Sequence, residues 1–339
     1  MDSRERVYRA VEFKGPDRVP FEWYEYRGAT DMGKTDIVWV GFKPLVEPKV
    51  EDLGNEVRVT DEWGCVWVSY KSIPTMGQPL GHPLRSWEDF ANYIFPEVAL
   101  EKRFEGVENA VRCLRERGKY IVGSLDFGIW ERYHFLRGFR EAVTDLYTRR
   151  ENAHKLLSIL TEFKIGLIKG YSELGVDCVG FTDDWGTQSG LMISPRLWVE
   201  VFKPYYARIF QEARRRGMHT YLHSCGNIYD IIGHLAEAGL NIIQLDAPHQ
   251  SGIERLSRSY AGRICFNCCI DIQKVLVKGV ESEIYEEARK MITLLGTESG
   301  GFIARQYPTL YHIGVKPEVS EIAYKAFLKY GVYKSMKDV

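Results

Sequence analysis

Residues 217–246, GMHTYLHSCGNIYDIIGHLAEAGLNIIQLD, hold one complete strand–helix–strand unit. The β-favouring run at 219–222 predicts one strand, and the run at 241–245 predicts a second. Between them, Asn227 begins a helix whose large apolar residues recur every three or four positions until Gly239 ends it. Two strands joined by one helix predict a βαβ unit with parallel strands.

The same alternation recurs along the chain. The β-favouring runs are 18–24, 36–42, 120–122, 176–181, 219–222, 241–245, 263–266 and 301–304. About eight strands alternating with helices favour a closed (β/α)8 TIM barrel over an open sheet, and we expect one domain over residues 1–339. The stretch 56–70 does not follow the pattern and predicts a hairpin or insertion, an elaboration of the N-terminal part. Ser194 and Pro195 are typical of a helix start, and Pro204 predicts a kink within the helix that follows.

Composition excludes several classes of protein. Lys and Arg number 45 and Asp and Glu 46, without a basic stripe, so we expect no nucleic-acid partner. No apolar run approaches the roughly 18 residues that a membrane span needs, and residues 1–10 lack the apolar core of a secretory signal. Seven irregularly spaced cysteines predict free thiols and a cytoplasmic protein. The P-loop, GxGxxG, GxSxG and HExxH motifs are all absent from the sequence.

In an α/β barrel the site lies where the strands end at their carboxyl side. Adjacent carboxylates Asp183 and Asp184 follow one predicted strand and are predicted to do acid–base work, although only one of them should face the site. The predicted substrate-binding residues are Trp185, Tyr24, Asp126, Gln244, Arg305 and Tyr307. The alternative is that such residues are ordinary polar turns, helix caps and bulky core.

The sharpest local feature is a His-x-Cys pair, His223 and Cys225. Residues two apart in a strand face the same side, so this pair can aim an imidazole and a thiolate at one cation such as zinc. The alternative is a packed histidine beside a buried thiol. Among candidate third ligands the favoured one is Cys269, which lies nearest its strand end. The other candidates for that position are Cys265, Cys268, His312, Asp184 and Asp246.

Several motifs resemble the uroporphyrinogen-decarboxylase superfamily. They are Gly15 to Pro20, Leu136-Arg137-Gly138, Asp183 to Gly186, Ser194-Pro195, Phe202 to Tyr205 and His223 to Asn227. The resemblance spans nearly the whole chain and implies the barrel fold. The superfamily contains decarboxylases and corrinoid-linked methyltransferases. The decarboxylases carry an Arg-Gln-Ala-Gly-Arg motif after the first strand, but residues 21–27 read FEWYEYR, which makes decarboxylation doubtful.

The resemblance to the methyltransferase branch implies a zinc site of His-x-Cys followed by a distant cysteine. His223 and Cys225 match the first two positions, but residues 300–308 contain no cysteine. This departure argues against coenzyme M as substrate and leaves the third ligand open. The resemblance implies methyl transfer from a small donor, with a methoxylated aromatic favoured, to the cob(I)amide of a separate corrinoid protein, and a possible homodimer. A metal-free lyase using Asp183, Asp184 and Arg305, or a non-catalytic corrinoid- or tetrapyrrole-binding barrel, are the alternatives.

Overall fold

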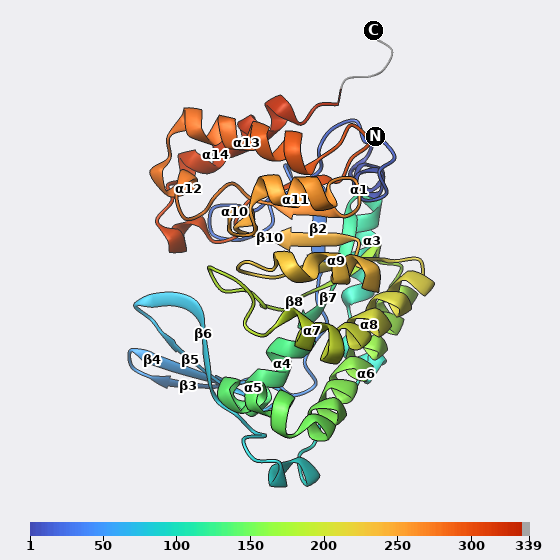
Figure 1. Cartoon of the computed structure of the whole chain (residues 1–339), viewed down its shortest axis with the longest axis vertical. Coiled ribbons are helices and arrows are strands. Elements are labelled where there is room, and N and C mark those ends of the chain that lie inside the picture. Colours follow the sequence, from blue (N-terminus) through green and yellow to red (C-terminus); the bar gives the residue numbers. More distant parts are fainter. Residues whose placement is uncertain (334–339) are drawn as a thin grey trace.

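A barrel of eight parallel strands lies at the centre of the computed structural model, which describes residues 1–333 apart from the side chains of residues 73–76 (Figure 1). The strands are β1 (Phe21–Glu22), β2 (Ile37–Val40), β7 (Tyr120–Phe127), β8 (Cys178–Thr182), β9 (His219–His223), β10 (Ile242–Leu245), β11 (Cys265–Cys268) and β12 (Phe302–Arg305). Their order is β1-β12-β11-β10-β9-β8-β7-β2. The two end strands meet where the Asp36 amide donates to the Phe21 carbonyl at 2.7 Å, which nearly closes the barrel. The predicted (β/α)8 fold is confirmed, whereas the single domain over 1–339 stays a prediction.

Helices surround the barrel, as the alternating pattern predicts (Figure 1). They are α1 (Ser3–Val11), α2 (Leu100–Arg103), α3 (Val107–Glu116), α4 (Ile129–Arg137), α5 (Phe139–Thr148), α6 (Arg150–Leu174), α7 (Pro195–Val201), α8 (Lys203–Arg215), α9 (Tyr229–Ala238), α10 (Pro248–Ser251), α11 (Ile253–Tyr260), α12 (Val275–Lys278), α13 (Glu281–Leu295) and α14 (Pro317–Tyr330), with 3-10 turns η1 (Glu88–Ala91) and η2 (Leu310–Ile313). Ser194 caps α7 as predicted, because its hydroxyl accepts from the Leu197 amide at 3.2 Å. The predicted kink at Pro204 is a break between two helices, with the proline in the first turn of α8. Within residues 1–333, no helix combines the length and apolar character that a membrane crossing requires.

A second, antiparallel sheet is inserted between β2 and β7. Its strands are β3 (Lys49–Leu53), β4 (Glu56–Thr60), β5 (Val66–Tyr70) and β6 (Ile73–Gly81), paired in that order. The predicted hairpin at 56–70 is therefore confirmed as β4 and β5, with one further strand on each side. Arg132 connects this sheet to the barrel, because it donates to Asp61 at 2.8 Å and to Asp126 at 2.6 Å.

The first predicted strand is much shorter than expected. Only Phe21 and Glu22 of the run 18–24 belong to the sheet. The amide of Trp23 turns aside to donate to the Thr35 hydroxyl at 3.2 Å, so the chain leaves the barrel immediately after Glu22. This early exit aims the residues after Glu22 across the mouth of the barrel.

The lower half of the barrel interior is packed shut, which leaves only the carboxyl end for a site. Its apolar side chains come from most of the barrel strands, and α1 closes the layer from below with Val7 and Val11. The barrel residues of this layer are Ile37, Tyr120, Val122, Cys178, Tyr221, Ile242, Cys265 and Ile303. Every one of these residues is buried, as expected for the filled interior of an eight-stranded barrel.

Candidate metal and ligand site

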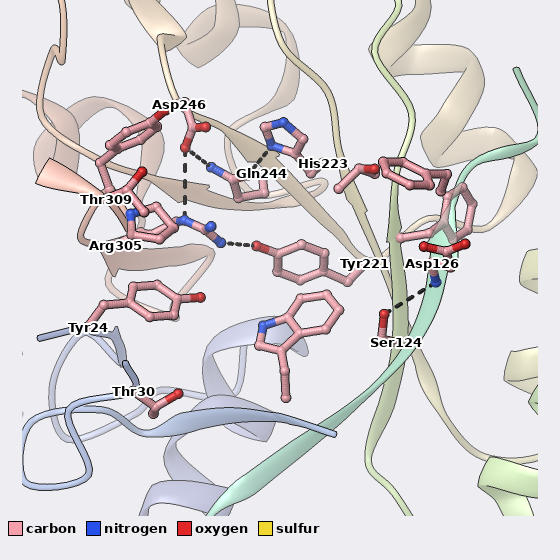
Figure 2. Close-up of a pocket in the computed structure, with 16 residues that line it drawn as sticks. Tyr24, Thr30, Ser124, Asp126, Tyr221, His223, Gln244, Asp246, Arg305 and Thr309 are labelled. Atoms are coloured by element: carbon pink, nitrogen blue, oxygen red, sulfur yellow. Dashed lines mark hydrogen bonds and ion pairs between the residues drawn. The ribbon is translucent and has the colours of Figure 1, made fainter. Parts of the chain in front are cut away.

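A cavity of about 460 Å³ opens at the carboxyl end of the barrel strands (Figure 2). It is lined by Tyr24, Thr30, Trp39, Ser124, Asp126, Phe127, Phe181, Thr182, Tyr221, His223, Gln244, Asp246, Arg305, Tyr307, Pro308 and Thr309. Five of the six predicted substrate-binding residues are among them; Trp185 is not. The size suits a small organic molecule, and the walls combine aromatic rings with a few polar groups, as in known ligand sites.

Three potential metal ligands converge beside this cavity. Asp184, His223 and Cys225 each present one ligand atom, and these atoms all lie within 4.8 Å of one another. Cys225 Sγ lies 3.3 Å from His223 Nε2, which in turn lies 3.5 Å from Asp184 Oδ1. Among the described residues this is the one such group that contains the predicted His-x-Cys pair.

The spacing of these atoms fits a zinc ion. Zinc bonds of about 2.3 Å to sulfur and about 2.0–2.2 Å to nitrogen or oxygen, at tetrahedral angles, place neighbouring ligand atoms about 3.4–3.6 Å apart. The two observed separations are close to that range. A thiolate, an imidazole and a carboxylate are all ordinary zinc ligands, and three protein ligands leave a fourth position for a substrate atom. The donor set therefore fits a catalytic type of zinc site.

The orientation of His223 is set by a chain of hydrogen bonds visible in Figure 2. His223 Nδ1 bonds to the side-chain oxygen of Gln244, and the Gln244 amide nitrogen donates to Asp246 Oδ1 at 2.8 Å. Because the Asp246 carboxylate accepts this hydrogen bond, the NH2 group of Gln244 points to Asp246. The side-chain oxygen of Gln244 therefore points to the imidazole. The proton then stays on Nδ1, which leaves the lone pair of Nε2 directed at Cys225 and Asp184.

Removal of this support should weaken metal binding without removing a ligand. For Gln244→Leu we expect a 10- to 100-fold lower zinc affinity, on the order of effects seen for such supporting residues. Competition titration with a chromophoric chelator measures it. Thr30→Ala, at another point of the same cavity wall, is the matched control and should leave the affinity unchanged. Equal zinc affinity in Gln244→Leu and the control would refute the orienting role.

Two glycines let the loops that carry Asp184 and Cys225 meet. Gly226 has φ +78°, and a Cβ built there would lie 2.3 Å from the main-chain carbon of Gly186. A Cβ on Gly186 would lie 2.5 Å from the Cys225 carbonyl oxygen. The approach is held by two hydrogen bonds: the Gly186 amide donates to Cys225 O at 3.1 Å, and the Cys225 amide donates to Asp184 Oδ1 at 2.7 Å. A side chain at either glycine would push the ligands apart.

We therefore expect Gly226→Ala to lower both stability and metal affinity. The left-handed backbone together with a backbone clash should cost about 2 kcal/mol or more of unfolding free energy. Thermal unfolding and zinc titration are the measurements. Gly190→Ala is the control, because Gly190 lies in the loop after β8 where an added Cβ would meet no atom within 4 Å, and this variant should behave like the unsubstituted protein. Tight zinc binding by Gly226→Ala would contradict this view of the loops.

The floor of the cavity is a polar network centred on buried Glu22. Its two carboxylate oxygens accept from five side chains on different parts of the barrel. The donors are Tyr24 (2.5 Å), Trp39 (2.9 Å), Arg305 (2.9 Å), Tyr221 (3.2 Å) and Asn267 (2.5 Å). Sequence reasoning missed Glu22, because it stands inside an apolar run and no spacing links its donors. It also missed Glu131, buried beside this end of the barrel, whose pKa is raised well above its usual range by burial and by nearby Asp184 and Asp183.

Cys269, the favoured third ligand, does not join the metal group. Its thiol is buried and donates to the Asp246 carbonyl oxygen at 3.2 Å. Strand β11 ends at Cys268, so the alternation assumed for Cys269 does not extend that far. Of the other candidates, Asp184 takes the place beside the His-x-Cys pair, while His312 lies exposed in η2.

Asp183 and Trp185 also lie elsewhere than predicted. Asp183 is fully buried and accepts from the Trp130 and Glu131 amides at the start of α4, at 3.1 and 2.8 Å. Burial raises its pKa to about 6. Trp185 is also fully buried; its ring stacks on Trp130 and donates to Tyr206 at 2.7 Å. Both residues hold helices against the barrel, whereas Asp184 between them faces the site.

The fold and the site together define a (β/α)8-barrel protein with a His-Cys-Asp group at its open end. The chain belongs to the uroporphyrinogen decarboxylase (URO-D) family, whose model matches residues 66–306. The matched region includes the metal group, Gln244, Asp246 and Arg305, but not Glu22 or Tyr24.

The chain is also similar to solved structures. A methyltransferase from Methanosarcina mazei superposes with a TM-score of 0.70 at 15% sequence identity, covering 97% of this chain and 99% of that one. A B12-independent methionine synthase from Shewanella sp. W3-18-1 superposes with a TM-score of 0.46 at 12% identity, covering 66% of each chain. At these identities the likeness is one of fold. No curated protein matches the sequence.

Proposed function

We propose that this protein is a zinc-assisted methyltransferase that moves a methyl group from a methoxylated aromatic donor to the cob(I)amide of a separate corrinoid protein. The single observation that carries the proposal is the convergence of Asp184, His223 and Cys225 at the edge of an aromatic-walled cavity. Family membership and the fold shared with the Methanosarcina methyltransferase support an enzyme of this broad class.

In this proposal each part of the site has a separate task. Asp184, His223 and Cys225 hold the metal, and the Asp246–Gln244 pair keeps His223 in the ligating tautomer. Zinc, when bound, supplies a Lewis acid to the ether oxygen and makes the departing phenolate a better leaving group. The aromatic walls hold the ring of the donor and exclude water from the bond that breaks.

The balance of the reaction is simple. The methyl–oxygen bond of the donor breaks, and its electron pair stays on the phenolate oxygen. The methyl carbon bonds to cobalt through the electron pair that cob(I)amide contributes. The phenolate takes a proton from water on release at the open mouth of the barrel.

The decarboxylase alternative has less support in the described cavity. A porphyrinogen with many carboxylates needs several cations, but Arg305 is the one Lys or Arg side chain among the described lining residues. Arg305 is itself paired with Glu22. The alternative of a metal-free lyase required Asp183 in the site, but Asp183 is buried beneath α4 and does not face the cavity.

Methyl transfer itself tests the proposal. Protein loaded with zinc, a methoxyarene and a reduced corrinoid protein should give a methylated corrinoid, followed by its visible spectrum. Treatment with a strong chelator should abolish the transfer, and added zinc should restore it. Absence of transfer from a broad panel of methoxyarenes, with zinc bound, would refute the proposal.

A further inference from the structure

We infer that the cavity selects against anionic donors and favours one whose ring carries a second oxygen that accepts a hydrogen bond from Arg305. This inference rests on the proposed function, in which the bound molecule is the methyl donor. It assigns the substrate class of that same site. It is carried by the charges around the cavity and by an unused hydrogen-bond donor in its wall.

The guanidinium of Arg305 is only partly used by the protein. Both of its hydrogen bonds leave from Nη1, to Glu22 at 2.9 Å and to the Tyr221 hydroxyl at 2.7 Å. Nε is buried and has no hydrogen-bond partner in the described part of the chain. Asp246 Oδ1 forms an ion pair with Nε at 3.9 Å (Figure 2), a distance too long for a hydrogen bond. The other terminal nitrogen, Nη2, also makes no hydrogen bond within the described residues, and it is not among the fully buried unpaired atoms. Because Arg305 lines the cavity, Nη2 is a ready donor to an acceptor that a ligand supplies.

The charge of Arg305 is already balanced. Glu22 is nine-tenths or more buried and sits against the guanidinium, so the pair presents no net charge to a ligand. Asp126, on the opposite wall, is likewise paired with Arg132 at 2.6 Å. Asp246 is the remaining carboxylate of the lining; it accepts from Gln244 and lies 3.9 Å from Arg305 Nε, but Glu22 already balances the charge of that guanidinium. The lining therefore carries an excess of negative charge.

The metal end does not reverse this balance. A thiolate from Cys225 and a carboxylate from Asp184 together neutralise a divalent ion, while His223 adds no charge as a neutral ligand. A ligand carboxylate would thus enter a cavity that repels it and lose its hydration. A neutral molecule avoids this cost.

The aromatic rings around the cavity suit such a neutral ligand. They are Tyr24, Trp39, Phe127, Phe181, Tyr221 and Tyr307. Trp39 and Tyr221 meet edge to face at 4.9 Å, so they form a rigid corner against which a flat ring can pack. The polar lining residues include the hydroxyl groups of Thr30, Ser124, Thr182 and Thr309 as well as Arg305, and these can recognise an oxygen by hydrogen bonds.

Binding measurements on the zinc-loaded protein test the inference without requiring turnover. The probes are methoxyphenol, methoxybenzene and methoxybenzoate, with the 2- and 4-isomers of each substituted ring, titrated by calorimetry at neutral pH. We expect the tighter methoxyphenol isomer to bind about tenfold more tightly than methoxybenzene, as one hydrogen bond to a charged donor implies. Both methoxybenzoates should bind at least about tenfold more weakly than that isomer.

A variant adds a test of the cause. Asp246→Asn keeps an oxygen that can accept from Gln244 but removes the excess negative charge of the lining, so methoxybenzoate should come within about threefold of methoxyphenol. Glu237→Gln removes a carboxylate from the surface of α9, outside the cavity lining, so it is the control and should keep the original preference. Methoxybenzoate binding to the unsubstituted protein as tightly as methoxyphenol overturns the inference, and so does failure of every probe to bind.

The outcome is separable from that of the proposed function. If the probes bind in the expected order of affinity but no methyl transfer occurs, the inference is supported and the proposed reaction is refuted. Methyl transfer from methoxybenzoate at a higher rate than from methoxyphenol would support the proposed reaction and refute the inference.

Discussion

His223→Ala is expected to remove tight zinc binding and to lower methyl transfer about a thousandfold, with little loss of stability. The imidazole lies between the other two ligands of the group, 3.3 Å from the thiol and 3.5 Å from the carboxylate. Without it, two ligands remain, fewer than the three of catalytic zinc sites. Metal assistance supplies several kcal/mol of transition-state stabilisation, and each 1.36 kcal/mol corresponds to tenfold in rate.

The measurements are zinc content by elemental analysis and the rate of corrinoid methylation at saturating zinc. His234→Ala is the matched control, since His234 lies on the surface in α9 beside Glu237 at 3.2 Å, away from the metal group. Cys225→Ser should follow His223→Ala, because serine keeps the shape of the side chain but not the thiolate. Retention of zinc and of full activity in both site variants would exclude the metal group from the reaction.

The barrel was predictable from the sequence because its signals are local. A run of β-favouring residues, a polar strand end and an amphipathic helix repeat along the chain, and each unit can be recognised without its neighbours. Strand 241–245 and β10 differ by a single residue. The first strand was overestimated at 18–24, because the hydrogen bond from Trp23 to Thr35 that ends it joins residues from separate segments.

The metal group was predictable in part for the same reason. His223 is the last residue of β9, and Cys225 follows two positions later; their side chains come together as predicted, 3.3 Å apart, although Cys225 lies beyond the strand. The third member was not predictable by alternation. Asp184 lies beyond the end of β8, where the chain path is set by the contact of Gly186 with Gly226. That contact joins two loops that are distant in the sequence, and no local pattern specifies it.

The hydrogen-bond network around Glu22 was even less predictable from the sequence. Glu22 accepts hydrogen bonds from residues on or after several different strands, among them Trp39, Tyr221 and Arg305. Each donor by itself resembles an ordinary core or loop residue. Only the closed barrel places them around one carboxylate, so a polar cavity floor of this kind emerges from the strand order and not from spacing.

Asp183→Ala is expected to destabilise the protein by about 3 kcal/mol or more while leaving the metal group chemically complete. Asp183 accepts from the Trp130 and Glu131 amides and from the hydroxyl of Tyr206. Alanine would leave these buried donors without a partner, at about 1–3 kcal/mol for each. It would also remove the cap from the first turn of α4, where a negative charge is favoured.

Asp184, the next residue in the chain, provides the control that separates a structural role from a metal-binding role. Asp184→Ala should lower zinc affinity and methyl transfer strongly but cost little stability, since Asp184 is partly exposed and accepts one main-chain hydrogen bond, from Cys225. Chemical denaturation and zinc titration of both variants separate the two roles. If Asp183→Ala unfolds like the unsubstituted protein but loses activity, Asp183 acts in catalysis, as the sequence alone suggested. We expect the opposite pattern because the two side chains point in different directions after β8 ends. The carboxylate of Asp183 lies beneath α4, whereas that of Asp184 faces the site.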